Sequence, residues 1–277
     1  SGGVPGGELL NIERVDGVPG HEAGIAGYDL CPITQELADA AGAQFMLEEA
    51  TGIAPAGDGW AVATDAGPME ARALILATGA AVGKLGVPGE AEFAGRGVSH
   101  CATCDGPLLR GKVAVVAGGG DSGMQEALTL AQHVARVVIV ERGEGLRGQA
   151  PYVAAVKAQP KIEVLAGHEI AAIEGSDRVT AVRVRTLVDG AEQLIEAQGL
   201  FAFPGLVPAI GPAVGLVMLA ADGRIAVDAA LRTSARGIFA AGNVRAGNGW
   251  RAAAAMGDGA SAAVAAAAYC DSGEWEG

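Results

Sequence analysis

The stretch Lys112-Val-Ala-Val-Val-Ala-Gly-Gly-Gly-Asp-Ser-Gly123 decides the fold of this 277-residue chain. A short apolar strand at 113–117 runs into a glycine-rich turn, and an Ala/Leu-rich helix is expected at about 122–132. Glycines spaced as G-x-G-x-x-G between a strand and a helix let the backbone approach a pyrophosphate at the helix N-terminus. This context predicts a dinucleotide-binding turn, with purely structural glycines as the alternative. Its candidate binding residues are Gly118, Gly120, Asp121, Ser122 and Gly123.

A pair of cysteines precedes this turn, in Cys101-Ala-Thr-Cys104-Asp-Gly. Cysteines separated by two residues can close a small disulfide ring and reopen it, and the spacing favours a reactive thiolate. Zinc usually needs four ligands, but Cys31 and Cys270 are isolated and the four histidines are scattered, so no metal site is expected. A dithiol beside a nucleotide-binding turn predicts electron transfer between a nicotinamide and a disulfide.

The composition indicates a folded α/β protein of about two domains. Half of the residues are hydrophobic but only 4% are aromatic, so the core must consist mainly of Ala, Val, Leu and Ile. The formal net charge of −13 disfavours a nucleic-acid surface. The Ala-rich stretch 252–268 is interrupted by Gly257-Asp258-Gly259, which predicts a packed helix broken at these glycines and not a membrane span.

Strands that alternate with helices predict parallel sheets with ligands at the carboxyl ends of the strands. A helix is expected at 29–41, where apolar residues recur at helical spacing. Within 179–188, valines alternate with arginines, as expected for a half-exposed hairpin strand. The other strands are expected at 44–48, 60–64, 73–77, 113–117, 137–140, 161–165, 200–203 and 238–241.

Four features of the chain resemble the low-molecular-weight thioredoxin reductase family of pyridine nucleotide-disulfide oxidoreductases. Gly6-Gly7-Glu8-Leu9 with Pro19-Gly20 resembles the flavin loop GGQL…PG, and Ala77-Thr78-Gly79 resembles the family's strand-end ATG. Gly97-Val-Ser-His100 before the cysteines resembles the redox motif. Thr233-Ser-x-x-Gly237-Ile-Phe-Ala-Ala-Gly242 resembles the second flavin fingerprint, which normally ends AGD. The resemblance runs from about Gly6 to the C-terminus.

The resemblance implies two doubly wound, Rossmann-like α/β domains, one inserted in the other. The FAD-binding domain would comprise 1–83 and 206–277, and 84–205 would bind the nicotinamide and carry the cysteines. Links near Gly83 and Gly205 are the expected hinges for the rotation of one domain against the other that the family uses. The family's N-terminal GxGxxG unit, which binds the FAD pyrophosphate, is missing, so the FAD domain is expected to be N-terminally incomplete and FAD binding to be weak.

The same resemblance implies a role for each residue of the redox motif. Cys104 would lie against the flavin, Cys101 would attack the disulfide of the partner, and Asp105 would protonate the leaving thiolate. The alternative for Asp105 is a turn residue before Gly106-Pro107. FAD contacts are implied for Gly6, Gly7, Glu8, Leu9, Thr78, Gly79, Gly242, Asn243, Arg251, Ala252 and Ala253.

The chain departs from the family where the cofactors would bind. Glu141-Arg142-Gly143-Glu144-Gly145-Leu146-Arg147 stands in place of the NADP signature HRRxxxR. A carboxylate at this strand end can accept hydrogen bonds from a ribose 2′-hydroxyl and repels a 2′-phosphate, which favours NADH over NADPH, although Arg142 and Arg147 could still bind a phosphate. Asn243 replaces the aspartate that normally holds the ribitol. Gly17 stands where a flavin-contacting asparagine is usual, and Trp250-Arg251-Ala252-Ala253 replaces a stretch that usually ends in RQA.

The sequence therefore predicts an FAD-dependent NAD(P)H:disulfide oxidoreductase that reduces a thioredoxin-like protein or a small-molecule disulfide. A cytoplasmic homodimer without nucleic-acid or membrane partners is expected. Two alternatives remain open. A dithiol oxidase of the same family, using FAD and O2, fits the altered NADP signature but not the intact glycine turn. A non-catalytic, degenerate nucleotide-binding protein fits Asn243 and the missing fingerprint but not the retained cysteine pair.

Overall fold

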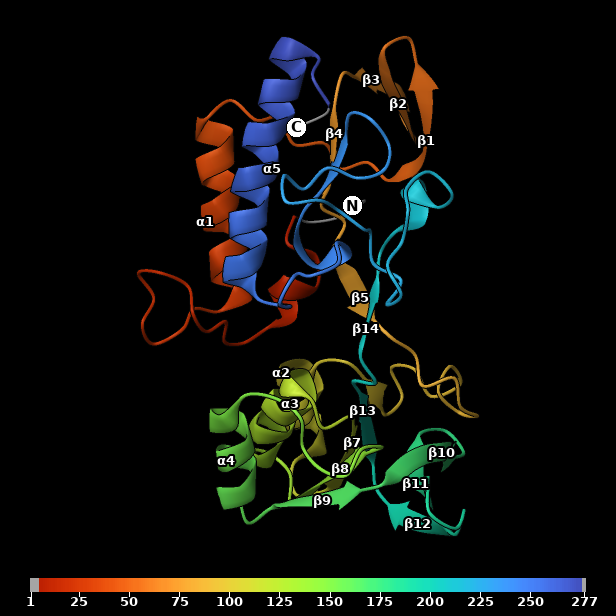
Figure 1. The fold of residues 1–277 in the computed structure, drawn as a ribbon. Helices are drawn as coiled ribbons and strands as arrows, with labels where there is room; N and C mark the ends of the chain where they lie inside the picture. Colours follow the sequence, from red (N-terminus) through yellow and green to blue (C-terminus); the bar gives the residue numbers. More distant parts are fainter. Residues whose placement is uncertain (1–4, 276–277) are drawn as a thin grey trace. The chain divides into compact units, whose positions relative to one another are not determined.

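The computed structural model describes residues 5–275, and the chain divides into two compact units, of which one is inserted in the other (Figure 1). Unit 1 comprises the chain up to Ala81 and from Val207 onward, and unit 2 comprises Val82–Leu206. The chain crosses between them at β5 (Ala80–Val82) and β14 (Leu206–Pro208), and these two strands pair with each other. The predicted α/β class is confirmed.

Unit 2 is built on a five-stranded sheet with the order β6-β13-β7-β8-β9, in which every pair of strands is parallel. The strands are β6 (Val98–Ser99), β7 (Val113–Ala117), β8 (Arg136–Glu141), β9 (Ile162–Ala166) and β13 (Gly199–Ala202). The helices are α2 (Ala102–Asp105), η2 (Gly106–Leu109), α3 (Asp121–Ala131) and α4 (Ala150–Ala158). An antiparallel sheet is formed by β10 (His168–Gly175), β11 (Val179–Thr186) and β12 (Glu192–Glu196).

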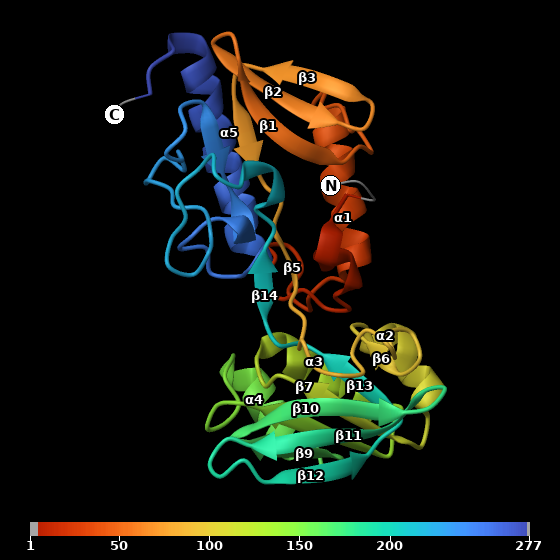
Figure 2. The ribbon, with the colours of Figure 1, turned by 90° about the vertical axis from the view of Figure 1, so that its right-hand side faces the viewer.

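The apolar runs of β7 and β8 follow from burial of the parallel sheet on both faces. Successive side chains of a strand point to opposite faces. Val115 and Val138 pack with the β10–β12 sheet, whereas Val116 and Ile139 pack with α3. Figures 1 and 2 show the two covering layers, with α3 and α4 on one side and β10–β12 on the other. The sheet is therefore a rigid base for the loops at its carboxyl end.

Unit 1 contains a parallel pair of strands, β4 (Leu74–Leu76) and β15 (Ile238–Ala240), and an antiparallel sheet, β1 (Ala50–Ala56), β2 (Gly59–Thr64) and β3 (Gly67–Ala71). Its helices are η1 (Gly7–Asn11), α1 (Gly27–Ala40), η3 (Gly211–Ala213), η4 (Gly242–Val244) and α5 (Ala252–Ser272). Small side chains let α5 approach the strands closely, since Ala262 and Ala266 pack against Phe239 and Ala241. Among residues 5–275, no helix is long and apolar enough to cross a membrane.

The strand expected at 44–48 does not form, and Phe45, Met46 and Leu47 are 42%, 49% and 71% exposed. A strand needs a neighbour for its backbone hydrogen bonds, and among residues 5–275 no strand pairs with this segment. The helix expected at 29–41 is confirmed as α1, but only part of its apolar face is covered, because Leu30 is buried while Leu37 is 67% exposed.

The break expected at Gly257 and Gly259 is also wrong, because α5 continues through both glycines. A glycine inside a helix costs about 1 kcal/mol relative to alanine. Packing of the alanines on β15 and the hydrogen bonds of Asp258, which lies between the two glycines, offset this cost.

Candidate functional site

The cysteines of the redox motif form a disulfide, Cys101–Cys104, with Cα atoms 5.4 Å apart. Cys101 is the N-cap of α2 and Cys104 lies within this helix, which follows the end of β6 at the carboxyl edge of the parallel sheet. Cys101 caps the short helix, because its sulfur accepts a hydrogen bond from the backbone N–H of Cys104 at 3.2 Å. Cys104 is exposed and Cys101 is half-buried, so the disulfide lies at the surface of unit 2.

Polar contacts from neighbouring elements hold the start of α2. The Ser99 hydroxyl accepts from the N–H of Cys101 at 3.1 Å, and a Glu126 carboxylate oxygen on α3 accepts from the N–H of Ala102 at 2.6 Å. Asp105 is half-buried one turn beyond Cys101, and its N–H donates to the Cys101 carbonyl at 3.1 Å. The sequence did not indicate Glu126, because its role depends on the packing of α2 on α3.

The glycine-rich turn of unit 2 has the geometry of a nucleotide-binding loop. Gly118 has φ +110°, and a Cβ there would lie 2.1 Å from the carbonyl oxygen of Phe203. A Cβ on Gly123 would lie 1.9 Å from the carbonyl oxygen of Gly118, so α3 can pack on the turn only because residue 123 is a glycine. Gly120 is the N-cap of α3 and has no side-chain cap, while Asp121 accepts a hydrogen bond from the N–H of Gln149. Ser122 is exposed on the first turn.

Glu141 ends β8 beside this turn and is only 4% exposed. Its carboxylate accepts hydrogen bonds from the N–H groups of Gly119 and Gly143, both at 2.7 Å, and from the Arg147 guanidinium at 2.8 Å. Arg142 pairs instead with Glu169 at 3.5 Å and is 73% exposed. Because Arg147 is already engaged by Glu141, the turn offers a carboxylate more readily than a free cation. The glycine cradle and this strand-end carboxylate fit the adenosine half of a nicotinamide dinucleotide.

Two turns of unit 1 meet at the carboxyl end of its parallel strands. Thr78 and Gly79 follow β4, while Gly242 and Asn243 follow β15, and the two strands pair in register from Leu74 and Ile238 onward. Within residues 5–275, the buried Oδ1 of Asn243 has no hydrogen-bond partner. An unpaired buried acceptor is rare in a folded protein, so this atom fits a hydroxyl donor from a ligand.

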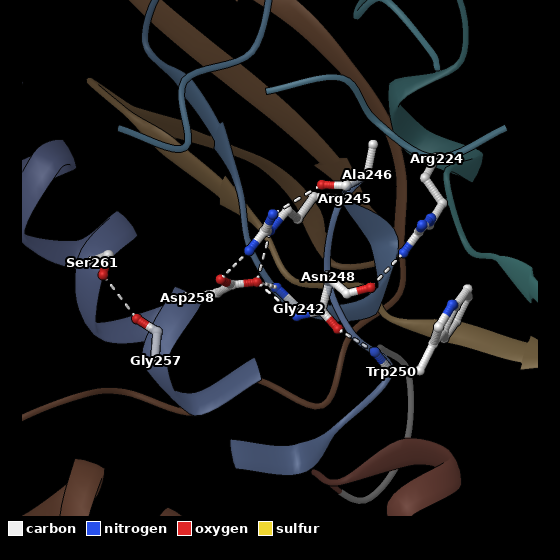
Figure 3. A network of polar contacts seen from close by, with 9 residues as sticks. All are labelled: Arg224, Gly242, Arg245, Ala246, Asn248, Trp250, Gly257, Asp258 and Ser261. Atoms are coloured by element: carbon white, nitrogen blue, oxygen red, sulfur yellow. Dashed lines mark hydrogen bonds and ion pairs between the residues drawn. The ribbon is translucent and has the colours of Figure 1, made fainter. Parts of the chain in front are cut away.

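A buried carboxylate holds the turn that carries Asn243 (Figure 3). Asp258 of α5 accepts hydrogen bonds from the N–H of Gly242 at 3.0 Å, from Nε of Arg245 at 2.8 Å and from Nδ2 of Asn248 at 2.8 Å. Burial raises the pKa of Asp258, but these hydrogen bonds and the charge of Arg245 together bring that pKa below its usual value. This network was not predicted from the sequence, although an aspartate between two glycines in an alanine-rich stretch is a visible signal.

The remaining flavin residues lie near the start of α5. Leu9 of η1 and Ala252 of α5 pack against the same buried cluster of Val15, Val18 and Leu30. Gly6 precedes η1, and a Cβ there would lie 2.6 Å from the sulfur of Cys31. Gly7 and Glu8 are exposed at the start of η1, Arg251 is the N-cap of α5, and Ala253 is exposed in its first turn. The open helix N-terminus, the orphan Asn243 acceptor and the two strand-end turns fit a dinucleotide such as FAD.

Comparisons with known proteins agree with this geometry. The sequence pattern of the pyridine nucleotide-disulphide oxidoreductase family matches residues 13–266. The thioredoxin reductase of Treponema pallidum is 39% identical over 96% of this chain and 86% of its own length, and that of Bacillus subtilis is 34% identical over 97% and 85%. The crystal structure of Lactococcus lactis thioredoxin reductase superposes with a TM-score of 0.93 at 33% identity, covering 97% of this chain and 89% of that one.

Proposed function

Because the chain belongs to the pyridine nucleotide-disulphide oxidoreductase family and is an FAD-dependent disulfide reductase of the thioredoxin reductase type, we propose that Cys101 and Cys104 pass electrons from NAD(P)H to the disulfide of a thioredoxin-like protein. The observation that carries this proposal is the surface disulfide on the same unit as a nucleotide-binding turn. A small-molecule disulfide is the second candidate substrate.

The cysteines exchange disulfides with the partner. The Cys101–Cys104 disulfide takes up two electrons and two protons to become a dithiol. The Cys101 thiolate then attacks one sulfur of the partner disulfide, forming a mixed disulfide and releasing a partner thiolate, to which Asp105 donates a proton. Attack by the Cys104 thiolate on the Cys101 sulfur restores the ring and releases the second partner thiolate. When bound, FAD and the nicotinamide supply the two-electron chemistry that reduces the ring.

Each unit is proposed to hold one cofactor. In unit 1, Asn243 would accept a hydrogen bond from an FAD hydroxyl, and the backbone around Thr78, Gly79 and the N-terminus of α5 would line the FAD site. In unit 2, the Gly118–Gly123 turn would hold the nicotinamide pyrophosphate. The links at Gly83 and Gly205 are the proposed hinges, and a hydrogen bond of 2.8 Å joins their backbones.

NADH is proposed as the preferred nicotinamide. Glu141 is buried, charged and hydrogen-bonded to the glycine turn, so a 2′-phosphate placed beside it would face a like charge. Arg147, which could neutralise that phosphate, is paired with Glu141. A weak affinity for NADPH remains compatible with the exposed Arg142.

Unit 1 is the proposed FAD-binding domain, and within residues 5–275 its parallel strands are β4 and β15. Homodimerisation and a cytoplasmic location are proposed from the family resemblance alone.

Anaerobic bleaching of the flavin tests the proposed electron path. With FAD supplied, NADH should bleach the absorbance near 450 nm, whereas a dithiol oxidase would be bleached by a small dithiol and not by NADH or NADPH. Bleaching by dithiol alone would replace the reductase by the oxidase. Absence of bleaching by either donor would favour a non-catalytic nucleotide-binding protein.

A further inference from the structure

A carboxylate outside the redox motif touches the backbone next to the reactive sulfur. Glu126 projects from the second turn of α3, is half-buried, and accepts the N–H of Ala102 at 2.6 Å. Ala102 is fully buried and directly follows Cys101. Four covalent bonds join the Ala102 nitrogen to the Cys101 sulfur, so the carboxylate lies within roughly 7 Å of that sulfur.

The other ionisable groups around α2 lie elsewhere. His100 precedes Cys101, but its Nδ1 contacts the carbonyl oxygen of Ala202 at 2.9 Å. Asp105 lies one turn later on the same helix. His133 follows α3 and would contact a Cβ at Gly106, at the far end of α2, and Arg110 follows η2 and is exposed. Glu126 is thus the charged side chain that α3 places against the start of α2.

We propose that Glu126 is a positioning residue that fixes the start of α2 and, through its negative charge, disfavours the Cys101 thiolate and so keeps the dithiol a strong reductant. The first effect follows from the hydrogen bond to Ala102. The second follows because a like charge within several ångströms disfavours an anion. The idea rests on the redox role proposed for the cysteines, but neither flavin nor nicotinamide enters its test.

The sign of the effect depends on pH. Reduction adds two electrons and two protons to the ring, and ionisation of a thiol afterwards draws the equilibrium toward the dithiol. Removing the charge of Glu126 promotes ionisation of the Cys101 thiol. This removal therefore stabilises the reduced form only at pH values at which the thiol ionises. The change in the reduction equilibrium is therefore negligible near pH 6 and grows toward pH 9.

Glu126→Gln separates charge from hydrogen bonding, because the amide oxygen can still accept the N–H of Ala102. The reduced 277-residue chain is alkylated with iodoacetamide between pH 5 and 10, and the modified peptides are quantified by mass spectrometry. Peptide quantification distinguishes the alkylation of Cys101 from that of Cys31, whose burial raises its thiol pKa and slows its reaction. Glu163→Gln is the matched control, since Glu163 lies on β9 in an exposed pair with Arg136.

The proposal expects the midpoint of the Cys101 profile to fall by about half a unit to one unit in Glu126→Gln, which raises alkylation at pH 7 about three- to tenfold. The equilibrium with glutathione should shift toward the dithiol about threefold or more at pH 9 and remain unchanged at pH 6. Glu163→Gln should match the parent. A Cys101 profile in Glu126→Gln that coincides with the parent, or an equal shift in Glu163→Gln, would overturn the proposal.

Glu126→Ala tests the positioning role separately, because it removes the hydrogen-bond acceptor as well as the charge. Loss of the acceptor should release the start of α2, seen as faster amide hydrogen exchange at Ala102 than in Glu126→Gln. Equal exchange in the two variants would contradict the positioning role.

Discussion

The two cysteines divide the proposed reaction into halves that mutation should separate. Replacing Cys101 or Cys104 by Ser should reduce turnover of the disulfide substrate to background, because a single cysteine cannot re-form the Cys101–Cys104 disulfide. Reduction of added FAD by the nicotinamide should stay within about twofold of the parent, since the proposed flavin and nicotinamide contacts are untouched. Stopped-flow absorbance and a thioredoxin-reduction assay measure the two halves. A Cys104→Ser protein with parental disulfide turnover would exclude the cysteines from the path.

Glu141 should decide the choice of nicotinamide. Exchanging Glu141→His and Gly143→Arg removes the like charge and supplies a cation, so the preference should reverse toward NADPH. Loss of a good polar contact costs about 1–3 kcal/mol, which corresponds to roughly tenfold to a hundredfold, and the nearby arginines place the effect at the low end. The measurement is kcat/KM for both nicotinamides, with Glu144→Gln as a neighbouring control that should not move the ratio. A parent that already prefers NADPH tenfold would refute the role of Glu141.

At the scale of elements, the hydrogen bonds of Asp258 join α5 to η4 and the residues after it. Loss of the Asp258 carboxylate should therefore destabilise unit 1. Asp258→Ala leaves Arg245 without its buried partner, and we expect a cost of roughly 3 kcal/mol. All three tryptophans of the chain, Trp60, Trp250 and Trp275, lie in unit 1, so urea unfolding followed by tryptophan fluorescence reports on this unit. Asp222→Ala, which removes an exposed partner of Arg224, is the control and should cost much less than Asp258→Ala.

The same network should make the stability of unit 1 depend on pH. The pKa of Asp258 is lower in the folded protein than its ordinary value, so the folded state favours the carboxylate. Its contribution is present above the unfolded pKa and is lost as the pH falls through the folded one. The difference between the parent and Asp258→Ala should therefore shrink below about pH 4. A difference that stays constant from pH 7 to pH 3 would contradict the assignment of the charge to Asp258.

Local patterns predicted the elements whose neighbours are close in sequence. The strand at 113–117 coincides with β7, and the helix after it begins within one residue of the prediction, because strand, turn and helix form one contiguous motif. The segment 44–48 failed because a strand depends on a partner that its own residues do not reveal. The continuity of α5 also could not be predicted, since it depends on hydrogen bonds from Arg245 and Asn248 that the fold brings to Asp258.

At the scale of the whole molecule, the redox cysteines and the glycine turn lie in unit 2, and the proposed flavin residues lie in unit 1. The motifs predicted Cys101, Cys104 and the glycine turn as site residues, because redox and phosphate chemistry restrict the allowed residue types strongly. Glu126 and Asp258 carry ordinary residue types for a helix, so only their burial and contacts distinguish them.

The most direct test of the account is a count of reactive thiols after reduction by the nicotinamide. The chain is treated anaerobically with NADH at saturating FAD, and labelled cysteines are identified by mass spectrometry. We predict that Cys101 and Cys104 both become labelled, with two thiols gained per chain, and that omission of NADH or FAD prevents the gain. A chain that binds FAD and whose flavin is reduced by NADH, but whose Cys101–Cys104 disulfide stays intact, would contradict the proposed electron path.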